Sequence, residues 1–238
     1  MRIDDFIMFG RTVPEKSQKY GVTVCGAGYS PEIRSFIRIY PLPIRCKIES
    51  RDMVTVEVDR SKHDSRHESW ALKDRNEKSV SGSLGKMTKE EIRQILEKRV
   101  TTLDNLNDAK ASLGVIKPDN FDVEMKTRAA IQDPNQMSLF DEFEETITFK
   151  TSSDYFKIPY LVTSEGKQKH LQLREWGIYE LMRKNPTKIN AEYVSNALHI
   201  GKDKDVFFIV GNMNQFKTVW LVIKVFSFDK KPAQLSMF

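Results

Sequence analysis

The chain has 238 residues, of which 39% are hydrophobic and 30% are charged, the balance of an ordinary globular protein. No apolar run approaches the length of a membrane span, and the first five residues include two acids where a secretory signal carries bases. Two cysteines, Cys25 and Cys46, are too few for a disulfide framework. We therefore expect a cytoplasmic protein with reduced thiols and no membrane partner.

The first 124 residues predict a β-rich structure with one helix. Alternating or β-rich runs predict strands at 20–25, 35–40 and 53–58, and a short apolar run predicts another strand at 113–116. Thr88, with Glu91 three residues later, forms a capping box. This pattern predicts a helix that begins there and continues to residue 103 or 106.

The remainder of the chain alternates strands with helices. Strands are predicted at 146–149 and 155–162, and an amphipathic pattern predicts a helix over 171–184, followed by a short helix over 191–198. Two strongly β-forming runs, 206–210 and 219–226, flank a polar loop with Gly and Asn, which is typical of a hairpin.

The net charge of +5 is unevenly spread, because two basic stretches flank an acidic, proline-containing middle. We therefore predict an α+β fold with two small mixed domains, mainly antiparallel strands and a few helices, joined by an acidic linker. Residues 1–124 would form a basic β-rich domain and residues 125–143 the linker. Residues 144–229 would form an α+β domain that ends in a β-hairpin, and residues 230–238 a C-terminal tail.

Two pentapeptides in the chain are nearly identical. Residues 136–140 read Gln-Met-Ser-Leu-Phe and residues 234–238 read Gln-Leu-Ser-Met-Phe, and each follows a proline by one residue. One copy lies in the predicted linker and the other in the predicted tail. An amide, a small polar residue and apolar residues that end in Phe are typical of a short peptide that inserts apolar anchors into a groove.

Both pentapeptides resemble the motif by which bacterial replication and repair proteins bind the sliding clamp, the β subunit of DNA polymerase III. The resemblance implies that the last two residues of each copy fill an apolar pocket of the clamp. It also implies that the glutamines hydrogen-bond at the rim, that the second residues pack alongside, and that the serines act as spacers. The residues concerned are Gln136, Met137, Ser138, Leu139, Phe140, Gln234, Leu235, Ser236, Met237 and Phe238.

The chain as a whole also resembles a family of uncharacterised proteins from bacteria and phages. The segments that carry this resemblance are 36–41, 64–69 and 207–212. That family brings no activity with it, so the resemblance bears on architecture alone.

The sequence leaves an enzymatic role open. Glu57 and Asp59 lie on one face of a predicted strand, about 7 Å apart, within reach of a single Mg²⁺. Asp64 and Glu68 share a face if their segment is extended. These four carboxylates are the candidates for a metal-dependent nuclease, and Mg²⁺ would be required only in that case. The alternative is a solvated row of ion pairs, so no metal site or cofactor is assigned.

Basic residues near aromatic ones predict contacts with nucleic acid. Arg38 lies between Phe36 and Tyr40 on one face of a predicted strand, an arrangement that can grip phosphates and stack bases. The alternative is an edge strand protected by charge. The predicted contacts are Arg34, Arg38, Arg45, Lys47, Arg51, Arg60, Lys62 and Arg66.

These observations favour a DNA-associated, nucleoid-located protein that docks on the sliding clamp through its two pentapeptides. It would act in DNA replication, DNA repair, or DNA processing linked to phages or defence. Two alternatives stay open. In the first, the clamp recruits the protein as a metal-dependent nuclease or other DNA-processing enzyme. In the second, the protein is a ligand-sensing module whose pentapeptides pack inside its own fold.

Overall fold

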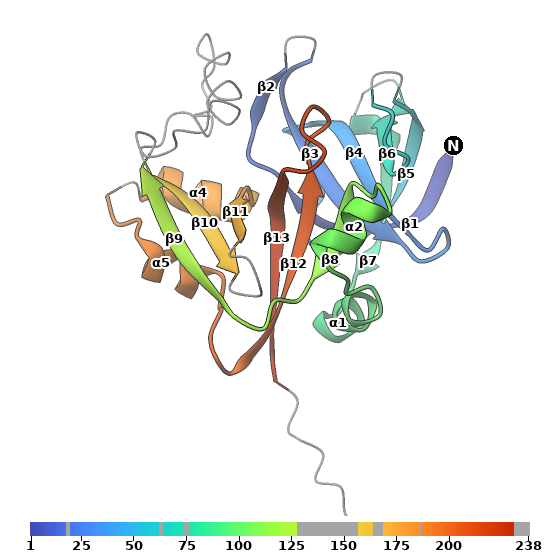
Figure 1. Cartoon of the computed structure of the whole chain (residues 1–238). Coiled ribbons are helices and arrows are strands. Elements are labelled where there is room, and N and C mark those ends of the chain that lie inside the picture. The colour runs from blue at the N-terminus through green and yellow to red at the C-terminus, as the bar shows by residue number, and fades with distance from the viewer. Residues whose placement is uncertain are drawn as a thin grey trace, which may run out of the picture.

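The computed structural model describes residues 1–17, 20–61, 64–73, 77–127, 157–163, 169–185 and 187–230. Both pentapeptides, the predicted strand at 146–149 and the predicted contact Lys62 lie outside the described residues. Within the described part the fold is α+β with mainly antiparallel strands, as predicted, and the strands form two sheets (Figure 1).

The first sheet is built from the N-terminal part of the chain. Five of its strands close into a ring, because the order β1-β3-β4-β6-β5 returns to β1, which pairs with both β3 and β5. Every pairing is antiparallel except that of β4 with β6. The strands are β1 (Arg2–Arg11), β2 (Glu15–Ser17), β3 (Gly21–Ser30), β4 (Ser35–Pro43), β5 (Asp52–Arg60), β6 (Ser69–Leu72) and β7 (Val80–Lys86), with a 3-10 turn, η2 (Glu77–Ser79).

Apolar side chains from all five ring strands fill its interior, among them Phe6, Ile39 and Val56. At Gly28, β3 lies so close to β1 that an added Cβ would be 2.3 Å from the carbonyl oxygen of Ile7. Glycine is therefore required at that position. The sequence analysis missed β1, because residues 6–9 form an unbroken apolar run that is buried on both faces rather than an alternating one.

Two helices connect the sheets. Helix α1 (Lys89–Glu97) begins with the predicted capping box, in which Thr88 accepts from the Glu91 amide and Glu91 accepts from the Thr88 amide. The predicted continuation to residue 103 or 106 is wrong, because α1 ends at Glu97 and a second helix, α2 (Leu103–Asp108), begins after a break. At the break, Val100 bridges to Val115 and Thr102 caps α2.

The second sheet has the order β8-β12-β13-β11-β10-β9, and its single parallel pair is β11 with β13. Two helices lie in sequence between β11 and β12. The elements are β8 (Leu113–Ile116), β9 (Phe121–Thr127), β10 (Lys157–Thr163), β11 (Lys169–Leu173), α4 (Trp176–Lys184), α5 (Ala191–Ala197), β12 (Lys204–Asn212) and β13 (Trp220–Asp229).

The predicted hairpin is confirmed as β12 and β13, and the short helix as α5. The helix predicted over 171–184 is only partly correct, because residues 171–173 belong to strand β11 and α4 begins at Trp176. Leu171 and Leu173 both face the apolar core of this sheet, and a spacing of two residues fits a strand as well as the edge of a helical stripe.

The two sheets share one topology. Strands β9-β10-β11-β13-β12 repeat the order β1-β3-β4-β6-β5, and in both series the third and fourth strands form the parallel pair. This is the connectivity of the OB-fold barrel. The second copy is open, since β8 occupies the side of β12 on which ring closure would occur. We call β1–β7 the first unit and β8–β13 with α4 and α5 the second unit.

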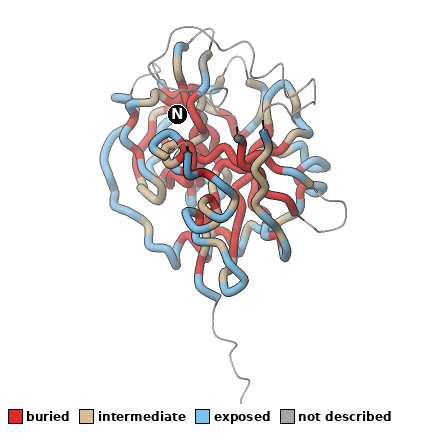
Figure 2. Tube along the Cα trace, turned by 90° about the vertical axis from the view of Figure 1, so that its left-hand side faces the viewer, coloured by how far each residue is buried: buried red, intermediate tan, exposed pale blue. Residues whose placement is uncertain are grey.

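The two units pack against each other over a shared apolar cluster. The outer faces of β1 and β3 contribute Phe9 and Tyr29, α1 contributes Ile92, and the second sheet contributes Phe207 and Ile223. Buried segments accordingly converge in the middle of the molecule (Figure 2). β9 belongs to the second sheet and extends to Thr127, past the predicted domain end at residue 124. Within the described ranges, no helix is long and apolar enough to cross a membrane.

Candidate functional site

A buried polar cluster joins the two units, and its centre is Glu68. This residue precedes β6 and is only 4% exposed. Its Oε1 accepts from the Ser112 amide and its Oε2 from the Ser112 hydroxyl, both at 2.9 Å. Ser112 lies just before β8, so a carboxylate of the first unit satisfies both donors of a buried serine beside the second sheet.

Arg38 of β4 completes this arrangement. Its Nη2 donates to the Ser112 carbonyl oxygen at 2.6 Å, and its backbone amide donates to the Glu68 carbonyl at 2.8 Å. The guanidinium is 4% exposed and lies close to Gly211 of β12, where an added Cβ would be 3.2 Å from Nη2. The side chain of Arg38 is therefore enclosed between the units.

Arg66 forms a second connection. It holds Asp64 in a bidentate pair, with Nε–Oδ1 and Nη2–Oδ2 distances of 2.8 and 2.6 Å, and its Nη1 donates to the Asn212 carbonyl at 2.7 Å. Burial raises the pKa of Asp64, but the hydrogen bonds and charge of Arg66 outweigh it and hold this pKa below its ordinary value. Asn212 in turn donates through Nδ2 to the carbonyl oxygen of Lys217 at 2.8 Å.

The three segments 36–41, 64–69 and 207–212 meet in this cluster, through Arg38, Glu68, Arg66 and Asn212. Sequence reasoning singled out these segments but had no signal that they converge, and it missed Ser112 altogether. Local spacing cannot reveal a partner 44 residues away in the chain. Because the polar groups mostly satisfy one another, the cluster positions the units and their loops.

The four carboxylates proposed for catalysis do not share one site in the structure. Glu57 is half-exposed and pairs with Lys73 at 3.4 Å, Asp59 is exposed on β5, and Asp64 and Glu68 are engaged as described above. Among the described residues, no group of three or more His, Cys, Asp or Glu side chains could hold a metal ion.

The predicted DNA contacts fall into two groups. For Arg38 and Arg66 the prediction of exposed DNA contacts is wrong. The second unit covers the outer face of β4 and encloses both side chains. The alternation of residues 35–40 was confirmed, but the face assigned to solvent is an interface. The predicted contacts that are exposed to solvent are Arg34, Arg45, Lys47 and Arg60. Arg51 is half-buried and donates to the Met87 carbonyl oxygen.

A groove of about 940 Å³ lies between the units at the end near α1. Its walls carry charges of both signs, most of them paired: Lys86 with Glu49, and Lys224 with Glu175, which is 6% exposed. Glu175 also accepts from the Val225 amide at 3.0 Å. Each of these two pairs lies within one unit, so these charges line the groove without crossing it.

The comparisons with known proteins add one match. A family model described as "Domain of unknown function (DUF8758)" matches residues 3–98. The matched stretch covers the first unit and α1 and none of the second sheet. No curated protein matches the chain.

Proposed function

We propose that this protein is a DNA-associated factor that docks on the bacterial sliding clamp through both pentapeptides and acts in DNA replication, DNA repair, or phage- or defence-related DNA processing. The observation that carries the proposal is the near-identity of residues 136–140 and 234–238, each separated from a preceding proline by one residue. Two copies of one anchor pattern favour a common receptor with repeated pockets, which a ring-shaped clamp offers.

The fold supports the association with DNA by analogy. OB-type barrels are frequently used to bind oligonucleotides, and this chain contains the connectivity twice. One fold serves many functions, so the fold alone does not imply DNA binding. The exposed cations of the first unit also support it, namely Arg34, Arg45, Lys47 and Arg60. These residues lie outside the buried interface and remain available for phosphates.

The positions of the pentapeptides along the chain favour bivalent attachment. The first lies in the connection between β9 and β10, and the second follows β13. Both connections start from strands of the second unit, which is held against the first by Arg38, Glu68 and Arg66. Once one pentapeptide is bound, the second is held near the ring at high effective concentration, which raises avidity.

The test is calorimetric titration of the full chain against the bacterial clamp. Phe140→Ala and Phe238→Ala should each weaken their site by on the order of 2–4 kcal/mol, because a terminal aromatic anchor leaves its pocket. Phe143→Ala, just beyond the first pentapeptide, is the matched control and should bind like the wild type. Absence of binding by the wild-type chain would refute the proposal.

A second measurement addresses internal packing of the pentapeptides. Removal of residues 234–238 should leave the melting temperature unchanged and weaken clamp binding if the segment is a docking peptide. A clear drop in melting temperature with unchanged clamp binding would instead support the internal packing alternative.

A further inference from the structure

We propose that two loops, one from each unit, form a joint site for single-stranded nucleic acid. The first comprises residues 64–67, which precede β6, and the second comprises residues 213–219, which join β12 to β13. The proposal deepens the proposed association with DNA, on which it rests, by naming the surface and the form of nucleic acid. The site differs from the outer faces of β3 and β4, which the second unit covers.

The two loops are held in a fixed relation. Arg66, clamped by Asp64, donates to the carbonyl oxygen of Asn212, the residue that opens the second loop. Asn212 spans the base of that loop by donating to Lys217. A binding surface made of loops needs such support, because disordered loops lose affinity through the entropy of ordering.

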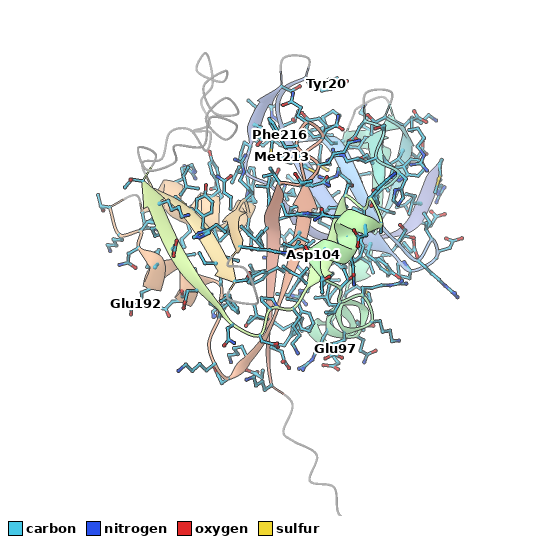
Figure 3. The ribbon with its side chains drawn as sticks, viewed as in Figure 1. Tyr20, Glu97, Asp104, Glu192, Met213 and Phe216 are labelled. Atoms are coloured by element: carbon cyan, nitrogen blue, oxygen red, sulfur yellow. The ribbon has the colours of Figure 1, made fainter. Side chains whose placement is uncertain are left out.

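The exposed side chains of these loops have the chemistry that unpaired bases require. Phe216 is partly buried and belongs to none of the apolar clusters of the described residues. Figure 3 shows Phe216 and Met213 on the loop between β12 and β13, at the same end of the molecule as Tyr20. An aromatic side chain on a surface loop can offer a sequence-tolerant platform for a base.

Cations lie beside this ring platform. Lys217 follows Phe216 and is exposed. Arg60 donates to the His67 carbonyl and stacks over Trp70, with its guanidinium carbon 3.8 Å from the ring centroid. Phosphates of a strand that crosses both loops would therefore meet positive charge on each side of the stacked base.

The geometry favours a single strand over a duplex. Stacking on Phe216 requires a base whose face is accessible, and paired bases inside a duplex hide both faces. Gln215, in the same loop, is exposed and offers amide donors and an acceptor suited to the edge of such a base.

The experiment measures fluorescence anisotropy of a labelled oligothymidylate, and of a duplex of equal length, with the full-length protein at low salt. Phe216→Ala should weaken binding of the single strand about 10-fold, whereas Phe216→Tyr, which keeps the ring, should bind nearly as the wild type does. Lys217→Ala should lower affinity and reduce the dependence of binding on log salt by about one unit. Lys184→Ala, at the exposed end of α4, is the matched control and should change neither quantity.

The proposal would be overturned if the wild type failed to bind the single strand, if it preferred the duplex, or if Phe216→Ala bound as tightly as the wild type. Melting temperatures of all variants are measured alongside, and a fold defect in Phe216→Ala is separated from lost stacking by the Phe216→Tyr variant. Titration of the same variants against the clamp keeps the two proposals apart, because clamp binding does not depend on Phe216.

Discussion

At the scale of single residues, the interface between the units depends on charged side chains that are buried away from water. Glu68 and Arg38 are each 4% exposed, and both hydrogen-bond to the polar groups of Ser112, although Nε of Arg38 is buried without a hydrogen-bond partner. Taking such groups out of water is unfavourable, and only complete pairing offsets the loss of hydration. A network of this kind is therefore sensitive to the loss of one member.

Replacement of Glu68 tests this dependence. Glu68→Ala should lower the free energy of unfolding by about 2–6 kcal/mol, because it leaves the amide and hydroxyl donors of Ser112 buried without their acceptor, at about 1–3 kcal/mol for each donor. Urea denaturation measures the change. Glu57→Ala, which removes a half-exposed carboxylate paired with Lys73, is the control and should cost less than about 1 kcal/mol. Equal effects of the two substitutions would contradict the assigned role of Glu68.

The Asp64–Arg66 pair predicts a dependence of stability on pH. The pKa of Asp64 is lower in the folded chain than in the unfolded one, so its contribution is present above about pH 4 and is lost as pH falls through the folded pKa. Asp64→Asn should therefore be less stable than the wild type at pH 7, and the difference should shrink in acid. Urea midpoints measured from pH 7 to pH 2 check this, and a difference that stayed constant would contradict it.

At the level of residues, the sequence pointed to the segment 64–69 but not to the residues that hydrogen-bond to it. Residues 64–69 stood out by their density of charge, and they do lie at a structurally important place. Their pattern suggested a metal or catalytic site because the sequence shows which charges are neighbours in the chain. It does not show that Ser112 and Asn212 supply the hydrogen-bond partners.

At the scale of elements, features with short-range causes were predictable. The capping box at Thr88 involves residues three apart, and the β12–β13 hairpin joins neighbouring runs of β-forming residues. Strand β11 was hidden because its apolar residues continue the stripe of the following helix α4. Strand β1 was hidden because both of its faces are buried, which removes the alternation that marks a half-exposed strand.

The cap of α1 gives the prediction at this scale. Thr88→Ala should destabilise the protein by about 1 kcal/mol, because the Glu91 amide loses its acceptor at the start of the helix. Thermal denaturation followed by circular dichroism measures the loss. Thr88→Ser retains the hydroxyl and should stay close to the wild type, so an equal loss in both variants would argue against capping.

At the scale of the whole molecule, one topology occurs twice without a visible repeat in the sequence. Strand order is set by which apolar faces cover each other, and many sequences satisfy the same order, so the duplication could not be read from residues. The fold class could be predicted, since alternating patterns and short helices determine it locally. The packing of the units could not, because it depends on contacts such as Phe9 and Tyr29 with the second sheet.

This packing predicts that the first unit does not fold on its own. A fragment of residues 1–98 would expose the apolar outer faces of β1 and β3 and leave Glu68 without Ser112. We expect it to lack a cooperative melting transition and to bind a hydrophobic dye. Production together with residues 99–238 should restore a single transition. A sharp melt of the fragment alone would contradict the prediction.

The enclosure of Arg38 and Glu68 has a consequence for comparisons among genomes. The matched stretch, residues 3–98, contains Arg38 and Glu68, whose buried hydrogen-bond partners lie outside it at Ser112. We expect a chain that carries this arginine and glutamate in the same fold to supply a main-chain carbonyl, an amide and a hydroxyl at that place, from its own residues or from a partner.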